Sequence, residues 1–185
     1  MTWKKVKLGD ICQINPQTGK LPESFIYIDL ESVVAGELLI EKHISKNNAP
    51  SRAQRLLSDG DILYQTVRPY QKNNYFFEKK NDLPYVASTG YAQIQTSLDK
   101  RFLYHYLHNE TFTNNVLARC AGTSYPAIAP SELSRIKVCF PTNIAEQQAI
   151  SKRLSNVDSL IQKEEALLSK YRKIKNGLMD KLLTN

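Results

Sequence analysis

The chain ends in a segment whose apolar residues recur with a seven-residue period. Ten successive positions alternate in steps of four and three residues, and eight of the ten are apolar. The ten positions are Ile150, Leu154, Val157, Ile161, Glu164, Leu168, Tyr171, Lys175, Leu178 and Leu182. This period is typical of the contact face of a coiled-coil helix. It predicts one unbroken helix from about Ile144 to Leu183, capped by Asn143 in a capping box with Glu146.

A helix of this length cannot bury its own apolar stripe. At a rise of roughly 1.5 Å per residue it spans about 57 Å, which exceeds the diameter of a domain built from the rest of the chain. We therefore expect a partner helix, held by Ile150, Leu154, Val157, Ile161, Leu168, Tyr171, Leu178 and Leu182. The charged positions Glu164 and Lys175 fit two arrangements. They lie either at a wide crossing, where long side chains reach solvent, or in the contact seam, where they set register and pairing direction.

The preceding residues show the shorter alternation of β-strands. We predict strands at Trp3–Leu8, Phe25–Asp29, Ile62–Val67, Tyr75–Phe77, Tyr85–Ala87, Gly90–Thr96 and Ile136–Phe140. Helices are predicted after Asp99, a suitable cap, through Phe112 to Leu117, and as one turn at Ser131–Leu133. Turns are predicted at Ala35–Glu37 and Ser58–Asp61, and a loop over the polar residues 42–58.

Strands and helices do not alternate regularly in this pattern, which disfavours a doubly wound nucleotide-binding fold. The pattern predicts an α+β protein with two parts. Residues 1–143 form one mixed domain of short strands, and residues 144–185 form the long coiled-coil helix.

Composition is that of an ordinary globular protein, with 185 residues, 42% hydrophobic and 23% charged. No apolar run approaches the roughly 20 residues of a membrane span, and no signal peptide follows the N-terminus. We therefore expect a cytoplasmic protein without a membrane partner. The net charge of +7 is divided between the helix and the domain. A positive excess favours an acidic partner, of which nucleic acid is the commonest.

Catalytic motifs are missing from the sequence. Cys12, Cys120 and Cys139 have no metal or disulfide spacing and are expected to be reduced, partly buried thiols. His105 and His108 form at most half of a metal site, and helix packing explains them equally simply. The isolated glycines make no phosphate loop, Gly60 and Gly122 are expected in turns, and no acidic cluster supports a nuclease. We expect neither a catalytic residue nor a metal site.

Polar loops at strand ends carry the residue types that read DNA. Arginine pairs with guanine, asparagine and glutamine pair with adenine, and hydroxyls anchor phosphates. The candidates are Ser51, Arg52, Arg68, Tyr70, Lys72, Asn73, Asn74, Ser88, Thr89, Thr123, Ser124 and Tyr125. Any surface loop is polar, so composition alone does not establish this role.

A series of short motifs runs along essentially the whole chain. The first are Trp3, Leu8-Gly9-Asp10-Ile11, Tyr27-Ile28-Asp29-Leu30, Gly36, Pro50-Ser51-Arg52-Ala53, Gly60-Asp61-Ile62-Leu63 and Val67-Arg68-Pro69. Further along are Ala87-Ser88-Thr89-Gly90-Tyr91, Phe102-Leu103-Tyr104, Gly122 to Ile128, Ile136 to Pro141, Glu146-Gln147, Asp158, Leu178-Met179 and Leu182-Leu183. In this order they resemble the specificity (S) subunit of type I restriction-modification systems.

The resemblance implies a non-catalytic subunit that binds double-stranded DNA. Such a subunit typically holds two target recognition domains, each followed by a helix, and the two helices pair antiparallel to hold the domains apart. Methylation comes from methyltransferase (M) subunits with S-adenosylmethionine, and cleavage from a restriction (R) subunit with ATP and magnesium. No cofactor is therefore expected in this chain.

The sequence departs from that pattern in carrying one domain and one helix, so it resembles a half-subunit. The resemblance and the unpartnered stripe together imply a homodimer that reads a symmetric, interrupted target and docks M subunits. A heterodimer with another half-subunit stays open. A coiled-coil adaptor without DNA affinity is the main rival, and a solitary nuclease the second. Steep weakening of DNA binding by salt would distinguish the first reading from the adaptor.

Overall fold

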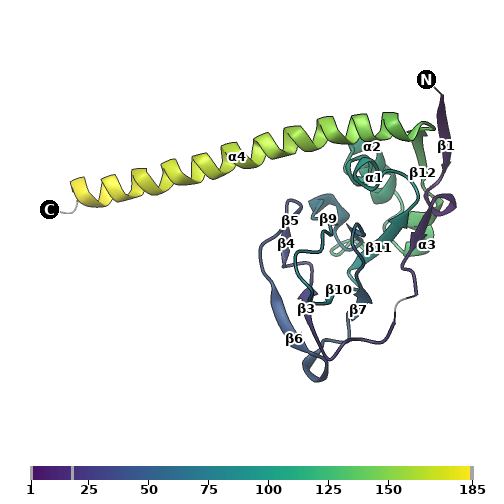
Figure 1. Ribbon diagram of the computed structural model, residues 1–185, viewed down its shortest axis with the longest axis horizontal. Coiled ribbons are helices and arrows are strands. Elements are labelled where there is room, and N and C mark those ends of the chain that lie inside the picture. Colours follow the sequence, from purple (N-terminus) through teal and green to yellow (C-terminus); the bar gives the residue numbers. More distant parts are fainter. Residues whose placement is uncertain (1, 18, 184–185) are drawn as a thin grey trace.

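The long helix expected from the heptad pattern is α4, Ile144–Leu183, in a computed structural model that describes residues 2–17 and 19–183. It projects from a smaller α+β unit, residues 2–143, termed the head (Figure 1). Asn143 caps it, since the Asn143 Oδ1 accepts a hydrogen bond from the Ala145 N–H at 2.9 Å. The return bond expected from Glu146 is not found among the described residues, so the full capping box is not formed.

Two four-stranded sheets form the centre of the head. The first has the order β6 (Lys42–Ser45), β3 (Ser24–Ile28), β10 (Tyr85–Ser88) and β7 (Ala53–Leu56), with β3 and β10 parallel. The second is antiparallel, with the order β2 (Cys12–Ile14), β11 (Tyr91–Thr96), β8 (Ile62–Gln65) and β9 (Tyr75–Phe76). A small hairpin joins β4 (Val33–Val34) to β5 (Glu37–Leu38).

Helices α1 (Lys100–Leu107), α2 (Glu110–Leu117) and α3 (Pro130–Arg135) cover the second sheet. Three short 3-10 turns are η1 (Leu8–Asp10), η2 (Lys46–Asn48) and η3 (Pro69–Gln71). Asp99 caps α1 as predicted, accepting from the Phe102 N–H at 2.7 Å. The main core lies between this sheet and these helices, where Tyr64 meets Phe112 edge to face at 5.8 Å. The predicted α+β class is confirmed.

The predicted loop over residues 42–58 is wrong, because it contains β6 and β7. Both are edge strands of the first sheet. An edge strand that buries one face carries polar residues on the other, so its composition resembles that of a loop. Strand β6 shows this alternation, with Lys42 and Ile44 half-buried and His43 and Ser45 exposed. The short strands β2, β4 and β5 were also not predicted, because two or three residues carry no readable period.

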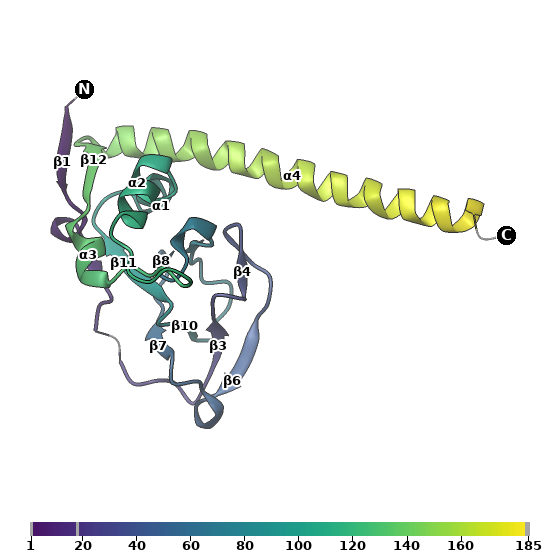
Figure 2. The same cartoon turned by 180° about the vertical axis from the view of Figure 1, so that it is seen from behind.

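Strand β1 (Trp3–Lys7) ties the beginning of the chain to the base of α4. It pairs antiparallel with β12 (Lys137–Pro141), which leads directly into the long helix. Figure 2 shows this pair standing beside the first turns of α4. The Thr142 N–H and hydroxyl both donate to the Thr2 carbonyl, at 3.1 and 3.2 Å. The base of the helix is therefore held by a strand pair as well as by its cap.

The first turns of α4 are fixed against α1 by polar contacts. The Gln147 side chain is buried, accepts from the Asp99 N–H at 2.9 Å and donates to the Pro141 carbonyl at 2.8 Å. Further along, His105 Nε2 lies 3.0 Å from the Ser155 hydroxyl. His105 Nδ1 lies 3.6 Å from the Asp158 carboxylate. Gln147, Ser155 and Asp158 are separated by eight and three residues, or about two turns and one turn, so one face of the helix is held by the head.

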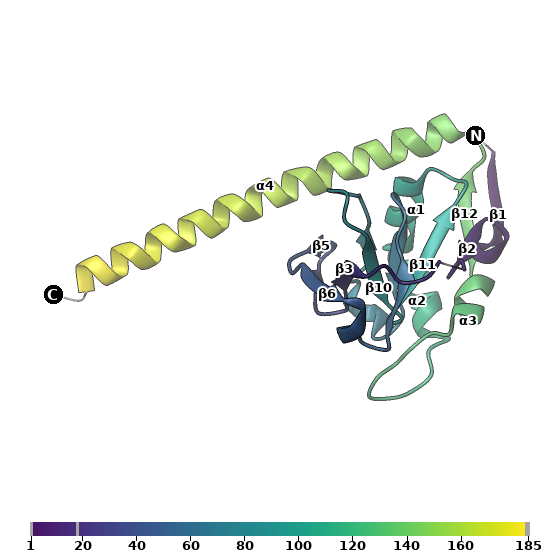
Figure 3. The same ribbon diagram turned by 60° about the horizontal axis from the view of Figure 1, so that its bottom comes forward.

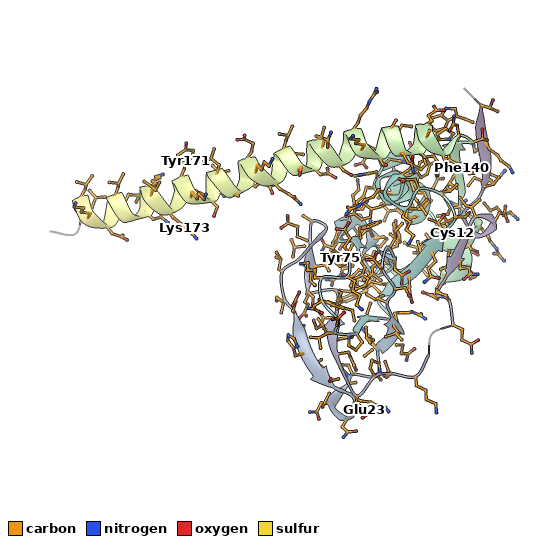
Figure 4. All side chains as sticks on the ribbon, viewed as in Figure 1. Cys12, Glu23, Tyr75, Phe140, Tyr171 and Lys173 are labelled. Carbon is orange, nitrogen blue, oxygen red and sulfur yellow. The ribbon has the colours of Figure 1, made fainter. Side chains whose placement is uncertain are left out.

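Beyond this junction the helix carries its side chains in solvent. Every described residue from Asn156 to Leu183, the segment termed the arm, is exposed. Tyr171 and Lys173 stand on the bare helix, far from Cys12, Tyr75 and Phe140 in the head (Figure 4). An arm with no tertiary packing keeps its apolar surface free for another helix.

Replacing Gln147 by alanine is expected to destabilise the protein by about 1–3 kcal/mol, because two buried backbone groups lose their partners. Urea unfolding followed by circular dichroism measures this free energy. The neighbouring Gln148→Ala is the matched control, since Gln148 is exposed, and should stay within about 0.5 kcal/mol of the parent. Equal stability of the two variants would show that the Gln147 bonds do not hold the junction.

Candidate nucleic-acid interface

Loops that are far apart in the sequence meet on one side of the head. The Thr89 N–H donates to the Arg52 carbonyl at 2.9 Å. The Thr66 N–H and hydroxyl donate to the Gly90 carbonyl at 3.0 and 2.8 Å. The Arg68 N–H donates to the Pro126 carbonyl at 2.7 Å. The loops at 51–52, 66–70, 89–90 and 121–127 are therefore consecutive neighbours, and this surface is termed the reading face.

Arg68 lies at the centre of this face and stacks on Tyr125. Its guanidinium carbon is 4.2 Å from the centre of the Tyr125 ring, a cation–π geometry. The Tyr125 side chain is 64% exposed, and its loop extends from the head on the side away from α4 (Figure 3). Arg68 Nε is buried without a hydrogen-bond partner among the described residues. The Arg68 Nε–H is therefore a donor that no described residue satisfies.

The backbone around Arg68 is conformationally unusual. Arg68 and Lys72 flank η3, and both have φ of 53°, in the left-handed region that non-glycine residues rarely adopt. Such conformations persist only where surrounding contacts hold them. The bond from Arg68 to Pro126 and the ion pair between Lys72 and Glu110, at 2.6 Å, provide two such contacts. Between them, Tyr70 is exposed.

Three of the predicted DNA-reading residues form hydrogen bonds within the head. Asn74 is buried, accepts from the Gln65 N–H at 2.8 Å and lies 3.3 Å from His108 Nε2. Buried Ser88 accepts from the Gly90 N–H at 3.2 Å. Asn73 Oδ1 accepts from the Ala35 N–H at 3.1 Å. Because Asn74 and Ser88 are buried and bonded within the head, we remove these two from the candidate set, whereas the half-buried Asn73, bonded only through Oδ1, stays in it.

The remaining candidates differ in exposure. Ser51, Arg52, Tyr70, Thr123, Ser124 and Tyr125 are exposed, while Arg68, Lys72, Asn73 and Thr89 are half-buried. Lys72 is paired with Glu110, which reduces the charge it offers to a ligand. Arg55 was not among the predicted DNA-binding residues. It lies half-buried on β7, and its Nε has no hydrogen-bond partner among the described residues. No pattern in the sequence distinguishes it from any other arginine.

The arm carries a second candidate surface, wider than the predicted stripe. Leu160, Leu167 and Ile174 recur every seven residues beside the seam and are exposed. They were missed because a two-position heptad template ignores the adjoining position. Ile150, in contrast, is half-buried against the head's own core and leaves the set of partner contacts. Leu160, Leu167 and Ile174 thus add a third apolar position per heptad to the seam. The exposed apolar seam residues are Leu154, Val157, Ile161, Leu168, Tyr171, Leu178 and Leu182.

Such a face is broader than the seam of a two-stranded coiled coil and is typical of helices that contact more than one neighbour.

No group of three or more His, Cys, Asp or Glu residues in the described part of the chain is arranged to hold a metal. Cys12, Cys120 and Cys139 are free thiols, and burial raises the pKa of Cys12 to about 11. Asp61 is buried in the predicted turn, where it accepts from Gln93 and Gln95 at 2.6 and 2.8 Å. No described helix is long and apolar enough to cross a membrane.

Comparison with known proteins gives one consistent family. Residues 1–170 match the model of the type I restriction modification DNA specificity domain. The chain is 26% identical to the type I restriction enzyme MjaVIII specificity subunit of Methanocaldococcus jannaschii, over 98% of this chain and 45% of that protein. It is 25% identical to the HindI specificity subunit of Haemophilus influenzae, over 80% of this chain and 34% of that protein.

Solved structures show the same architecture. The HsdS subunit from Thermoanaerobacter tengcongensis has a TM-score of 0.73 at 26% identity, covering 97% of this chain and 48% of that one. The S subunit from M. genitalium shares the fold, with a TM-score of 0.62 at 17% identity, over 99% of this chain and 46% of that one. The chain therefore spans about half the length of these relatives, or less.

Protonation of His108 is expected to destabilise the head at mildly acidic pH. Burial lowers the pKa of His108 below the ordinary value of 6.5, so the unfolded chain binds the proton more readily than the folded one. The resulting stability is complete above the unfolded pKa and is lost as pH falls below it. Urea midpoints should therefore be lower at about pH 5.5 than at about pH 7.5.

The His108→Gln variant should show a smaller drop between these two pH values. His105, whose pKa burial also lowers, accounts for the remainder. The control is His43→Gln, because His43 is exposed on an edge strand and should leave the pH dependence unchanged. An unchanged drop in His108→Gln would contradict this assignment.

Proposed function

Because the chain belongs to the type I restriction modification DNA specificity family, we propose that it is a non-catalytic half of a DNA-specificity subunit. In this proposal the head reads one part of a DNA target through its reading face. The arm joins the head to a second copy and offers a docking surface to M subunits. Through the M subunits it would engage the R subunit, in the cytoplasm, where the DNA is.

The convergence of loops on the reading face is the observation that carries this proposal. Arg52, Arg68 and Tyr125 come from three different loops, and hydrogen bonds link the Arg52 loop to the Arg68 loop through residues 89–90, and the Arg68 loop to the Tyr125 loop directly. Arginine guanidinium groups and the polar and aromatic side chains of loops are the groups that recognise bases and backbone phosphates. The excess positive charge of the chain, +7, supports an anionic partner of large size.

The exposed arm supports association with other helices. Burying one large apolar side chain contributes about 1.5–3 kcal/mol, and the arm exposes a run of them. A second copy brings an identical stripe, which makes a symmetric pair the simplest solution. Two heads related by a two-fold axis would read an interrupted palindrome. The row of Leu160, Leu167 and Ile174 would remain for M subunits, which supply S-adenosylmethionine-dependent methylation.

A coiled-coil adaptor without DNA affinity is the second candidate, favoured by the exposed arm alone. Salt dependence separates the two. If the head contacts several phosphates, affinity for target DNA should fall on the order of 100-fold or more between about 50 and 200 mM salt. Fluorescence anisotropy with the assembled complex of this chain and M subunits measures it. Absence of DNA binding by that complex would favour the adaptor.

Loss of Arg52 or Arg68 is expected to alter which DNA the complex prefers. A lost base contact costs about 1–3 kcal/mol and relaxes specificity at one position, whereas a lost phosphate contact weakens all sequences alike. We expect this for Arg52→Ala and Arg68→Ala in competition binding. The control Lys4→Ala removes an exposed cation from β1, outside the reading face, and should match the parent. If both arginine variants also match it, the reading face is misassigned.

Mapping methylated adenines after co-expression with M subunits tests the symmetric target. We expect a split palindrome methylated on both strands. An asymmetric target would exclude the homodimer and leave the heterodimer with another half-subunit.

A further inference from the structure

Starting from the antiparallel pairing that the family resemblance implies, we propose that the two arms adopt one specific register, in which Glu164 of each copy faces Lys175 of the other. The inference rests on the proposed homodimer and adds what determines its geometry. Both residues occupy seam positions and are exposed. Neither makes an ion pair with any residue that the structure describes. The seam thus contains one acidic and one basic residue, each in need of an opposite charge.

Neither residue has such a charge within reach on its own helix. Side chains three and four residues apart are the neighbours on a helix surface. For Glu164 these are Leu160, Ile161, Leu167 and Leu168, all apolar. For Lys175 they are Tyr171, Arg172, Leu178 and Met179, which include a like charge and no acid. An opposite charge must therefore come from another chain.

Antiparallel pairing satisfies both residues at once and leaves the other seam layers apolar. Because the seam steps by four and three residues, placing Glu164 opposite Lys175 fixes the remaining layers. Ile161 then meets Leu178, Leu168 meets Tyr171, and Val157 meets Leu182, each pair occurring twice by symmetry. The two charged layers lie symmetrically on either side of the centre.

Other arrangements bury unpaired or like charges. A shift of one heptad in one direction sets Glu164 against Leu168 and Lys175 against Val157. The opposite shift sets Glu164 against Leu182 and Lys175 against Tyr171. A parallel pair in register places each charge against its own copy. Like charges in contact cost several kcal/mol, and an unpaired buried charge is also unfavourable, so the seam disfavours all three.

Residues beside the seam favour the same register. Glu165 and Arg172 each directly follow a seam residue and occupy the same flanking position of the heptad. In an antiparallel pair this position faces the same position of the partner helix. In the proposed register, Glu165 of one copy lies nearest Arg172 of the other. One heptad shift brings Glu165 near Glu165, and the opposite shift brings Arg172 near Arg172. The flanking charges are therefore complementary only in the register that the seam charges select.

The exposed part of α4 contains all the layers of this register. Leu183 lies opposite Asn156 of the other copy, and every described residue from Asn156 to Leu183 is exposed. Within this stretch Asp158 lies 3.6 Å from His105 of the head, but Asp158 is not a seam residue. The register therefore needs no seam residue that the head covers.

Charge reversal tests the pairing. Glu164→Lys or Lys175→Glu creates two like-charged layers, so each variant should dimerise on the order of 100-fold more weakly than the parent in analytical ultracentrifugation. An equimolar mixture of the two variants should recover a dimer, since both layers are then complementary. The double variant, with both charges reversed in one chain, should also recover it. Lys173→Glu is the control, because Lys173 lies on the outer face of the arm, and should dimerise like the parent.

Disulfide formation tests the register. In chains with Cys120 and Cys139 replaced by serine, a mixture of Ile161→Cys and Leu178→Cys proteins should cross-link rapidly under mild oxidation. Mixtures of Ile161→Cys with Tyr171→Cys, and of Leu168→Cys with Leu178→Cys, report the two shifted registers. They should cross-link at least about tenfold more slowly, because those positions lie in different layers.

The outcomes separate this inference from the proposed function. A parent chain that stays monomeric, alone and with M subunits, would overturn the homodimer and with it the register. A parent dimer that tolerates both charge reversals, or that cross-links through a shifted pair, would overturn only the register. Circular dichroism melting of each variant shows whether the head stays folded. Because the substituted residues of the arm lie beyond Asp158, the arm residue that contacts His105 of the head, we expect unchanged melting.

Discussion

The attachment of α4 to α1 is the interaction on which the rest of the structure depends. Gln147 joins the cap of α1 to the end of β12. About two turns further along α4, Ser155 contacts His105 of α1. These contacts hold a helix of 40 residues by its first turns. Because the helix is rigid over its length, a small change of angle at the junction would move its tip by many times more. The head and the arm can act together only because this junction is tight.

The elements that could be predicted from the sequence were those with a strong period or an unambiguous cap. The bounds of α4 followed from its heptads, and α1 followed from Asp99 and the apolar residues after it. Strands β6 and β7 were not predicted, because an edge strand with one buried face has the composition of a loop. The pairing of β3 with β10 in parallel could not be predicted either, since 56 residues or more of chain separate them and no local pattern records which strands become neighbours.

The reading face shows the same division between local and non-local information. The polar loops around Arg52, Arg68 and Tyr125 were visible as composition, and the structure shows that hydrogen bonds link them in a row, with residues 89–90 between the first two. Asn74 and Ser88 have the same composition, but their side chains turn inward to satisfy backbone groups. Whether a polar residue serves the ligand or the fold depends on burial, and burial is decided by the whole packed chain. The row of Leu160, Leu167 and Ile174 was, in contrast, fully visible in the sequence, and a wider heptad template would have found it.

The pairing of β1 with β12 has a consequence for which part of the head can be replaced without disturbing the rest. The two strands bring the beginning and the end of the head together at the base of α4. All the reading loops lie in the stretch of chain between these two strands. That stretch therefore behaves as a cassette, whose contents can be replaced while the frame and the arm stay in place. Under the proposed function, recombination within the cassette would change the DNA preference and leave the means of assembly as it was.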